Sequence, residues 1–241
     1  MLDIHDDGRV RILTLNRPEA LNAFNDALYH ACGTALEKAQ ADDSVACVVI
    51  TGAGRGFSAG QDLGEMGRLG TIGGEERAQA GLGFPHFLDT LAAFPKPVIA
   101  AVNGVGVGIG MTMLLHVDCT FISETARLRA PFVPLGVVTE AASSVLMPLV
   151  MGHQRAYEKL YTGEWITAHE AVECGLALRV VGPEELMPAA LDLAHRIARM
   201  PVAALVATKQ LVIAGRIDVV RAARAREDDV FRSMVGAPAN V

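Results

Sequence analysis

Two nearly continuous apolar runs, each followed by a glycine-rich turn, constrain the fold of this chain more than any other feature. Residues 45–51 and 97–102 lack the alternation of a half-exposed strand, so each predicts a strand that is covered on both faces. Glycines cluster directly after them, in residues 52–60 and 104–110. Glycine permits unusual backbone angles and lets a ligand approach the backbone closely. Two such turns leading into helices could direct free N–H groups at one anionic atom, although a pair of tight loops would also use glycine.

The rest of the pattern predicts an α/β core with a helical C-terminal part. Residues 9–15 and 117–122 are typical of strands, and apolar residues recur at helical spacing from Ala27 to Ala39. After Ala141 the pattern becomes helical, with amphipathic segments at the positions 183–199, 202–214 and 218–233.

Composition narrows the class of protein. Of the 241 residues 51% are hydrophobic and 20% are charged, which favours a globular core. A net charge of -6 without a basic run argues against nucleic acid as a partner, but does not exclude a phosphorylated ligand. The four cysteines and seven histidines show no metal-ligand spacing, so no metal site is predicted. No apolar stretch reaches the length of a membrane span, and Asp3, Asp6 and Asp7 do not suit a signal peptide, so we expect a cytoplasmic protein.

The glycine-rich turns match neither common phosphate motif. GxGxxG fails because its last position would be Ile109 or Met111, and no GK[ST] of a P-loop is present. A GxSxG match at residues 56–60 would make Ser58 a hydrolase nucleophile. A nucleophile elbow follows its strand directly, whereas five residues, TGAGR, separate this match from Ile50, so the hydrolase is a disfavoured alternative.

Four segments together resemble the crotonase (enoyl-CoA hydratase/isomerase) family. Residues 57–66 (FSAGQDLGEM) resemble its FxAGxDLxEM segment, and residues 96–104 (KPVIAAVNG) resemble its KPVIAAVNG strand and turn. Residues 15–23 and 160–176 are similar to its LNRPxxxNAL and LTGxxxxAxEAxxxGLV segments. The resemblance covers about residues 8–215. It implies a ββα spiral core of two roughly perpendicular sheets in residues 1–190. It also implies a C-terminal helical region in residues 191–241 that forms trimers, which commonly pair into hexamers.

The resemblance also implies roles in binding an acyl-CoA. The backbone N–H groups of Ala59 and Ile109 would form an oxyanion hole; Ile109 stands where the family usually has glycine, and its side chain restricts the backbone and occupies space. No cofactor is implied beyond the coenzyme A that the substrate carries. The substrate-binding positions that match the family are Ala20, Leu21, Arg55, Ala59, Gln61, Asp62 and Leu63. Among these, Arg55 would pair with a CoA phosphate or remain a solvated loop charge.

The catalytic carboxylates decide between reactions of the family. A hydratase of this family holds one water with two glutamates, and the matching positions here are Thr112 and Phe132. Residues 135–144 (LGVVTEAASS) instead resemble the LGxxxEGxSS segment of peroxisomal-type Δ3,Δ2-enoyl-CoA isomerases, in which this glutamate is the single base. The resemblance therefore predicts an isomerase of fatty-acid metabolism with Glu140 as the base. Glu140 could also be an ordinary acid in the first turn of a helix. A hydratase, another enolate reaction and a non-catalytic acyl-CoA binder stay open.

Overall fold

The larger of two sheets carries the core. The computed structural model describes residues 1–65 and 82–234, so Met66 of the FxAGxDLxEM-like segment lies outside the described residues. Six strands pair in the order β1-β2-β3-β5-β7-β10, with β1 antiparallel to β2 and the other pairs parallel. They are β1 (Leu2–Asp7), β2 (Val10–Leu15), β3 (Cys47–Gly52), β5 (Val98–Val102), β7 (Cys119–Ser123) and β10 (Arg179–Val181).

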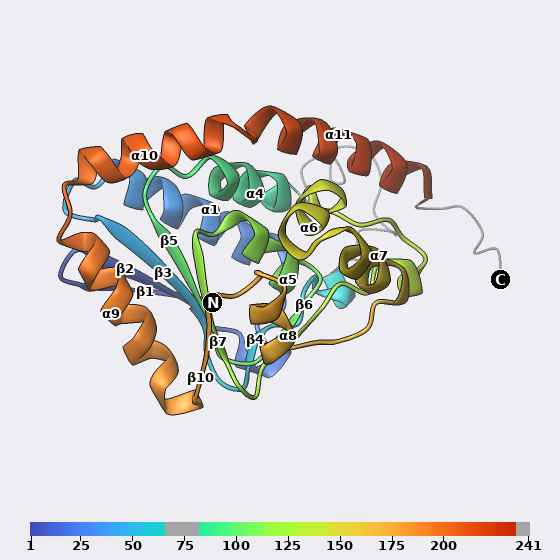
Figure 1. The fold of residues 1–241 in the computed structure, drawn as a ribbon, viewed down its shortest axis with the longest axis horizontal. Helices are drawn as coiled ribbons and strands as arrows, with labels where there is room; N and C mark the ends of the chain where they lie inside the picture. The colour runs from blue at the N-terminus through green and yellow to red at the C-terminus, as the bar shows by residue number, and fades with distance from the viewer. Residues whose placement is uncertain (66–81, 235–241) are drawn as a thin grey trace.

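Both faces of this sheet are covered, as the apolar runs predict. β3 and β5 are buried along almost their whole length. Helices α1 (Asp26–Ala41) and α4 (Gly83–Ala93) cover one face, and α9 (Leu186–Ala198) covers the other (Figure 1). The predicted strands at residues 45–51 and 97–102 are confirmed. β1 has no counterpart in the prediction, because its acidic side chains face solvent and give no apolar pattern.

A smaller sheet forms around the glycine-rich turns. Its strands pair in the order β4-β6-β8-β9, and both β4 with β6 and β6 with β8 are parallel. They are β4 (Gly56–Ser58), β6 (Val105–Val107), β8 (Arg127–Arg129) and β9 (Ile166–Thr167). Because β4 and β6 run in the same direction, the turns that follow them leave the sheet at the same edge.

The C-terminal part is helical, as expected. Helices α10 (Val202–Ala214) and α11 (Ile217–Met234) extend along one side of the molecule, over α4 and α6 (Figure 1). The helix α9 runs across position 190, and the division of the chain at that point stays a prediction. The remaining helices are α5 (Ile109–Thr112), α6 (Ser143–Met151), α7 (His153–Thr162) and α8 (Ala168–Glu173). Short 3-10 turns are η1 (Pro18–Ala20), η2 (Met113–His116), η3 (Val133–Leu135) and η4 (Pro183–Glu185).

Within the described residues, no single helix has both the length and the apolar character needed to cross a membrane. One bent pair, Pro183–Ala198 with Val202–Ala214, meets the criterion together by length and composition, with a bend of 106° between its two parts.

Candidate active site

The two glycine-rich turns pack directly against each other. Gly60 has a φ of +94°, and a side-chain carbon there would lie 2.7 Å from the carbonyl oxygen of Val107. A side-chain carbon on Gly110 would lie 2.5 Å from the carbonyl oxygen of Ser58. Both distances are far shorter than atoms tolerate, so only glycine allows this approach. The parallel pairing of β4 with β6 therefore brings the residues after Gly60 next to the start of α5.

The backbone N–H groups at this junction differ in whether they are already paired. Ala59 N–H donates to the Leu21 carbonyl at 2.8 Å, so this N–H, which the resemblance assigns to the oxyanion hole, has an acceptor within the protein. On either side of Gln61, the Phe24 N–H donates to the Gly60 carbonyl at 2.7 Å and the Asp62 N–H donates to the Phe24 carbonyl at 2.8 Å. The Gln61 N–H takes part in neither bond. In residues 1–65 and 82–234 the Gln61 N–H has no acceptor.

Ile109 supplies a second open N–H. It is the first residue of α5, and the first N–H groups of a helix have no acceptor within it. The Gly108 carbonyl accepts instead from Met111 at 2.9 Å and from Thr112 at 2.8 Å. The Ile109 side chain is buried in the core.

Ser58 has a structural environment. It is fully buried, and its hydroxyl donates to the Asn22 carbonyl at 2.9 Å and accepts from Gly60 N–H at 3.2 Å. No histidine or carboxylate hydrogen-bonds to this hydroxyl among the described residues. The geometry does not support a serine nucleophile.

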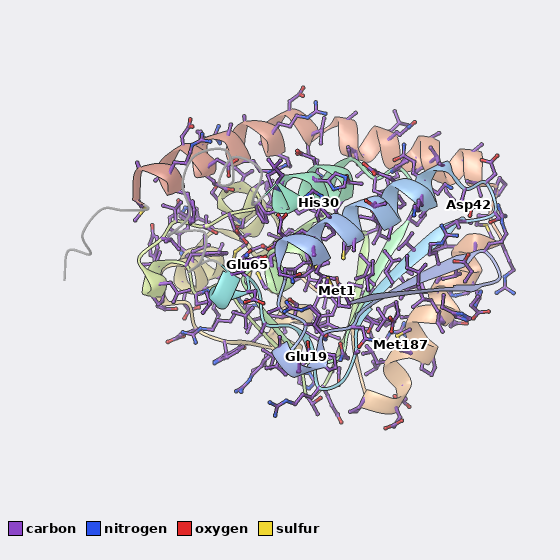
Figure 2. All side chains as sticks on the ribbon, turned by 180° about the vertical axis from the view of Figure 1, so that it is seen from behind. Met1, Glu19, His30, Asp42, Glu65 and Met187 are labelled. Atoms are coloured by element: carbon purple, nitrogen blue, oxygen red, sulfur yellow. The ribbon has the colours of Figure 1, made fainter. Side chains whose placement is uncertain are left out.

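The helix α1 orders the segment that contains Gln61. The buried Tyr29 hydroxyl donates to Gln61 Oε1 at 2.9 Å, and the Tyr29 ring stacks on Phe24 with centroids 4.6 Å apart. Glu65 accepts from the Asp26 N–H at 2.7 Å, at the beginning of α1 (Figure 2). Tyr29 thereby holds the Gln61 side chain, and the bond to Asp26 ties Glu65 to the same helix.

Glu140 lies in the loop before α6, and this loop contacts the segment that follows α5: His116 of η2 donates to the Ala141 carbonyl at 2.8 Å. Burial and then the charge of Glu140 raise the pKa of Tyr29. The Glu140 side chain is half-buried, and its carboxylate has no hydrogen-bond partner in the part of the chain that the structure describes. Burial above all, and then the negative charges of Glu227 and Asp228, raise its pKa to about 8.

Glu140 is not a first-turn acid. The helix α6 begins at Ser143 with Ala142 as its N-cap residue, so Glu140 precedes the helix. Ala141 and Ala142 both have left-handed backbones, with φ of 60° and 57°. The Ser143 N–H donates to the Glu140 carbonyl at 3.0 Å, so the chain reverses direction in a tight turn between Glu140 and α6.

The remaining candidate substrate-binding residues lie around the same junction. Asp62 pairs with Arg17 at 2.9 Å, which lowers the pKa of Asp62, so its carboxylate is committed to the protein. Leu63 and Arg55 are exposed, and Arg55 has no ion-pair partner among the described residues. Ala20 ends the turn η1, and the carbonyl of the next residue, Leu21, accepts the hydrogen bond from the Ala59 N–H. Among the described residues, no three histidine, cysteine or acidic side chains come together as a metal site would require.

Comparison with known proteins places this arrangement in a family. The family model described as "Enoyl-CoA hydratase/isomerase" matches residues 6–237. The chain belongs to the enoyl-CoA hydratase/isomerase family. Its fold is accordingly the crotonase fold, which solved structures of the family share.

Some similar proteins are named isomerases and others are named hydratases. The 1,2-epoxyphenylacetyl-CoA isomerase of Escherichia coli is 36% identical over 212 residues, 86% of this chain and 80% of that protein. Human enoyl-CoA delta isomerase 2 is 33% identical over 228 residues, 94% of this chain and 57% of that protein. A crystal structure titled enoyl-CoA hydratase, EchA8_6 of Mycobacterium marinum, is 50% identical and superposes with a TM-score of 0.83, covering 88% of this chain and 99% of that one.

Thr112 and Phe132 occupy the two positions that carry the water-holding glutamates in hydratases of this family. Thr112 is fully buried in α5, and its hydroxyl has no partner in the described structure. Phe132 is also buried, beside η3. Neither can accept a proton from water.

Two contributors to the site carry no recognisable signal in the sequence, and a third, Gln61, is expected from the sequence only as a substrate-binding position. The Gln61 N–H is identified only by the bonds on either side of it. Tyr29 has the spacing of an ordinary core residue of a helix, and Glu227 belongs to a charged run that resembles a solvated helix face. A signal exists only in the tertiary contacts.

We expect Ala141→Gly to stabilise the protein. In the LGxxxEGxSS pattern this position is glycine, and the φ of 60° explains why, since a left-handed backbone costs a non-glycine residue about 1–2 kcal/mol. Glycine also increases the conformational entropy of the unfolded chain, which offsets part of this gain. The free energy of unfolding, measured by urea denaturation, should therefore rise by about 0.5–1 kcal/mol. Ala222→Gly, at an exposed position inside α11, is the matched control and should destabilise by about 0.5–1 kcal/mol. Equal destabilisation by both substitutions would contradict the assigned backbone.

Proposed function

We propose that this protein converts 3-enoyl-CoA to 2-enoyl-CoA, with Glu140 as the single base. The observation that carries the proposal is the half-buried Glu140 carboxylate, which has no partner among the described residues and a pKa of about 8. His116 joins the loop of Glu140 to the segment directly after α5, whose first residue, Ile109, has one of the two open backbone N–H groups. A pKa near the working pH suits a group that must both take and return a proton. The family membership supplies the acyl-CoA substrate class.

The proposed reaction uses these groups in two steps. Glu140 takes a proton from C2 of the thioester, and the electrons move to the thioester oxygen to form a dienolate. The N–H groups of Gln61 and Ile109 donate hydrogen bonds to that oxygen, and each such donor contributes about 3–4 kcal/mol of transition-state stabilisation. Glu140 then returns the proton at C4, which leaves the double bond between C2 and C3. We assign the first donor to Gln61 instead of Ala59, because Ala59 is already paired with Leu21.

The coenzyme A portion is proposed to lie along the surface around the two turns. The backbone of residues 59–63, with Ala20 and Leu21, would contact the adenine and pantetheine. Arg55 is exposed without an ion-pair partner among the described residues, which leaves its guanidinium available for a phosphate. The proposal requires no other cofactor.

Replacing the base tests the reaction most directly. Glu140→Gln keeps the size of the side chain but removes the proton acceptor, so the turnover number for 3-enoyl-CoA should fall by about 10²–10⁴-fold or more. The KM should change little, because Gln61 and Ile109 still donate to the thioester. Formation of 2-enoyl-CoA is followed spectroscopically, with Glu124→Gln, an exposed glutamate after β7, as the matched control.

Hydration is measured in parallel, since similar proteins are also named hydratases. With Thr112 and Phe132 in place of two glutamates, the wild type should hydrate crotonyl-CoA negligibly. Efficient hydration, or wild-type isomerase turnover in Glu140→Gln, would refute the assignment of the base. Activity on neither substrate would favour a non-catalytic acyl-CoA binder or a different enolate reaction.

The raised pKa of Glu140 predicts opposite effects of pH on activity and stability. The base must be ionised, so kcat/KM should increase as the pH rises through about 8. The folded pKa is above the ordinary value of 4.5, so the folded state holds this proton more tightly than the unfolded state does. The contribution of protonated Glu140 to the free energy of unfolding is therefore lost as the pH rises from 4.5 to about 8.

Glu140→Gln cannot lose this proton, which makes the difference measurable. At pH 9 the variant should be more stable than the wild type by about 1 kcal/mol or more, a rise in Tm of about 2–4 °C. At pH 4, where both proteins are uncharged at this position, the two should melt alike. A pH-independent difference in Tm would show that Glu140 has an ordinary pKa.

We also propose that the C-terminal helices form a trimer, or a dimer of trimers. Apolar side chains lie on the surface of α10 and α11: Val212 is 64% exposed and Val219 is 50% exposed, while Leu205 is partly covered. Exposed apolar groups on adjacent helices favour burial against another subunit.

Light scattering at micromolar concentration should give a trimer or hexamer. Val212→Asp should shift the mass toward the monomer, because a charge would be buried at the interface. Asp192→Asn, on the exposed side of α9, serves as the control and should leave the mass unchanged. A monomeric wild type would refute the proposed assembly.

A further inference from the structure

A carboxylate from the C-terminal helix binds the segment that follows Glu140. Glu227 of α11 is only 6% exposed. One of its oxygens accepts from the Ala142 N–H at 2.7 Å, and the other accepts from the Ser144 N–H at 2.9 Å and from the Ser144 hydroxyl. All of these donors lie more than 80 residues away in sequence.

These bonds replace the capping that α6 lacks. The N-cap residue of α6 is Ala142, which has no side-chain acceptor for the first N–H groups of the helix. Glu227 satisfies these donors from a different helix, and a negative charge at a helix N-terminus is favourable. The bond between Glu227 and Ala142 also holds one of the two left-handed residues of the reversal.

The other side of the same segment is held by His116. Its Nε2–H donates to the Ala141 carbonyl at 2.8 Å, and burial lowers the pKa of His116 to about 4. The imidazole is therefore neutral at pH 7 and acts only as a hydrogen-bond donor. Ala141 and Ala142, the two residues after Glu140, are thus each bonded to a buried side chain from a separate element.

The charged groups that act on the Glu140 carboxylate belong to α11. Glu227 and Asp228 raise the pKa of Glu140, and Arg224 opposes them. Arg224 is itself paired with Asp89 of α4. The Tyr29 phenol of α1 and the His116 imidazole of η2 stay uncharged near pH 7. Among these groups Glu227 has both a direct bond to the segment and an electrostatic effect on Glu140.

We propose that Glu227 is a positioning residue for the reaction, which fixes the backbone of residues 140–144 and thereby sets where the Glu140 carboxylate lies. This inference rests on the proposed function for its catalytic consequence. Its structural consequence, a coupling between α11 and the loop before α6, is independent of which reaction occurs.

Two substitutions distinguish the effect of the length of the Glu227 side chain from the effect of its charge. Glu227→Asp keeps the charge but shortens the side chain by one methylene, so it should break the bonds to Ala142 and Ser144. Glu227→Gln keeps the length and removes the charge, and it retains one acceptor oxygen in place of two, so it loses the bond to Ala142 or the bonds to Ser144 but not both. Asp229→Asn, an exposed acid of α11 that pairs only with Arg232 among the described residues, is the matched control.

The first readout uses the ligand-free protein. Hydrogen exchange of the peptide that spans residues 140–147 should become at least about 10-fold faster in Glu227→Asp, because its buried N–H groups lose their acceptor. In Glu227→Gln the titration midpoint of Glu140, followed by carbon-13 NMR of the carboxyl groups, should move down toward the ordinary glutamate value. Asp229→Asn should change neither quantity.

The second readout is kinetic. Glu227→Asp should lower kcat at least about 10-fold and change KM by less than about twofold, since the base moves while the oxyanion donors remain. Glu227→Gln should shift the rise of kcat/KM to lower pH. The proposal is overturned if both variants leave loop exchange, the Glu140 midpoint and the pH profile unchanged and lose activity only in proportion to their global stability in urea. A wild type without isomerase activity would refute the proposed function, and the exchange and titration results would still decide the role of Glu227.

Discussion

The close backbone contact between the two glycine-rich turns is the interaction on which the site depends. Gly60 lies against the Val107 carbonyl at a distance that excludes any side chain. This contact requires β4 and β6 to pair in parallel, so that both turns leave the sheet at one edge. The backbone bonds around it then pair Ala59 with Leu21 and leave the Gln61 and Ile109 N–H groups open in the described structure. The large sheet and its covering helices serve to hold this contact in place.

The carboxylate of the site is maintained at some cost in stability. Glu140 lies half-buried without a hydrogen-bond partner in the described chain, and the charges of Glu227 and Asp228 oppose its ionisation. Ala141 and Ala142 add backbone strain, because non-glycine residues rarely adopt left-handed angles. Glu227 offsets part of this cost by its bonds to Ala142 and Ser144. Unfavourable local features of this kind persist at functional sites when the surrounding structure stabilises them.

Much of the fold could be predicted from periodicity, and the short strands could not. The apolar runs that became β3 and β5 were recognisable because strands buried on both faces contain little else. β4 and β6 have three residues each and are rich in glycine, so their pairing depends on tertiary contacts and not on local preference. For the site, the sequence pattern indicated Glu140 and Ile109 but assigned the other donor to Ala59. The pairing of Ala59 with Leu21 and the position of Gln61 appear only when Phe24 lies beside them.

By itself the sequence determined the residue types at the positions that the family resemblance compares: two glycine-rich turns, a glutamate at position 140, and Thr112 and Phe132 where hydratases carry acids. These are local identities, and a pattern is sufficient to identify them. Only the tertiary structure decided which N–H groups stay open, how strongly Glu140 holds its proton, and that α11 reaches back to the loop before α6. Each of these depends on burial and on bonds between residues far apart in the chain, which a local sequence pattern does not reveal.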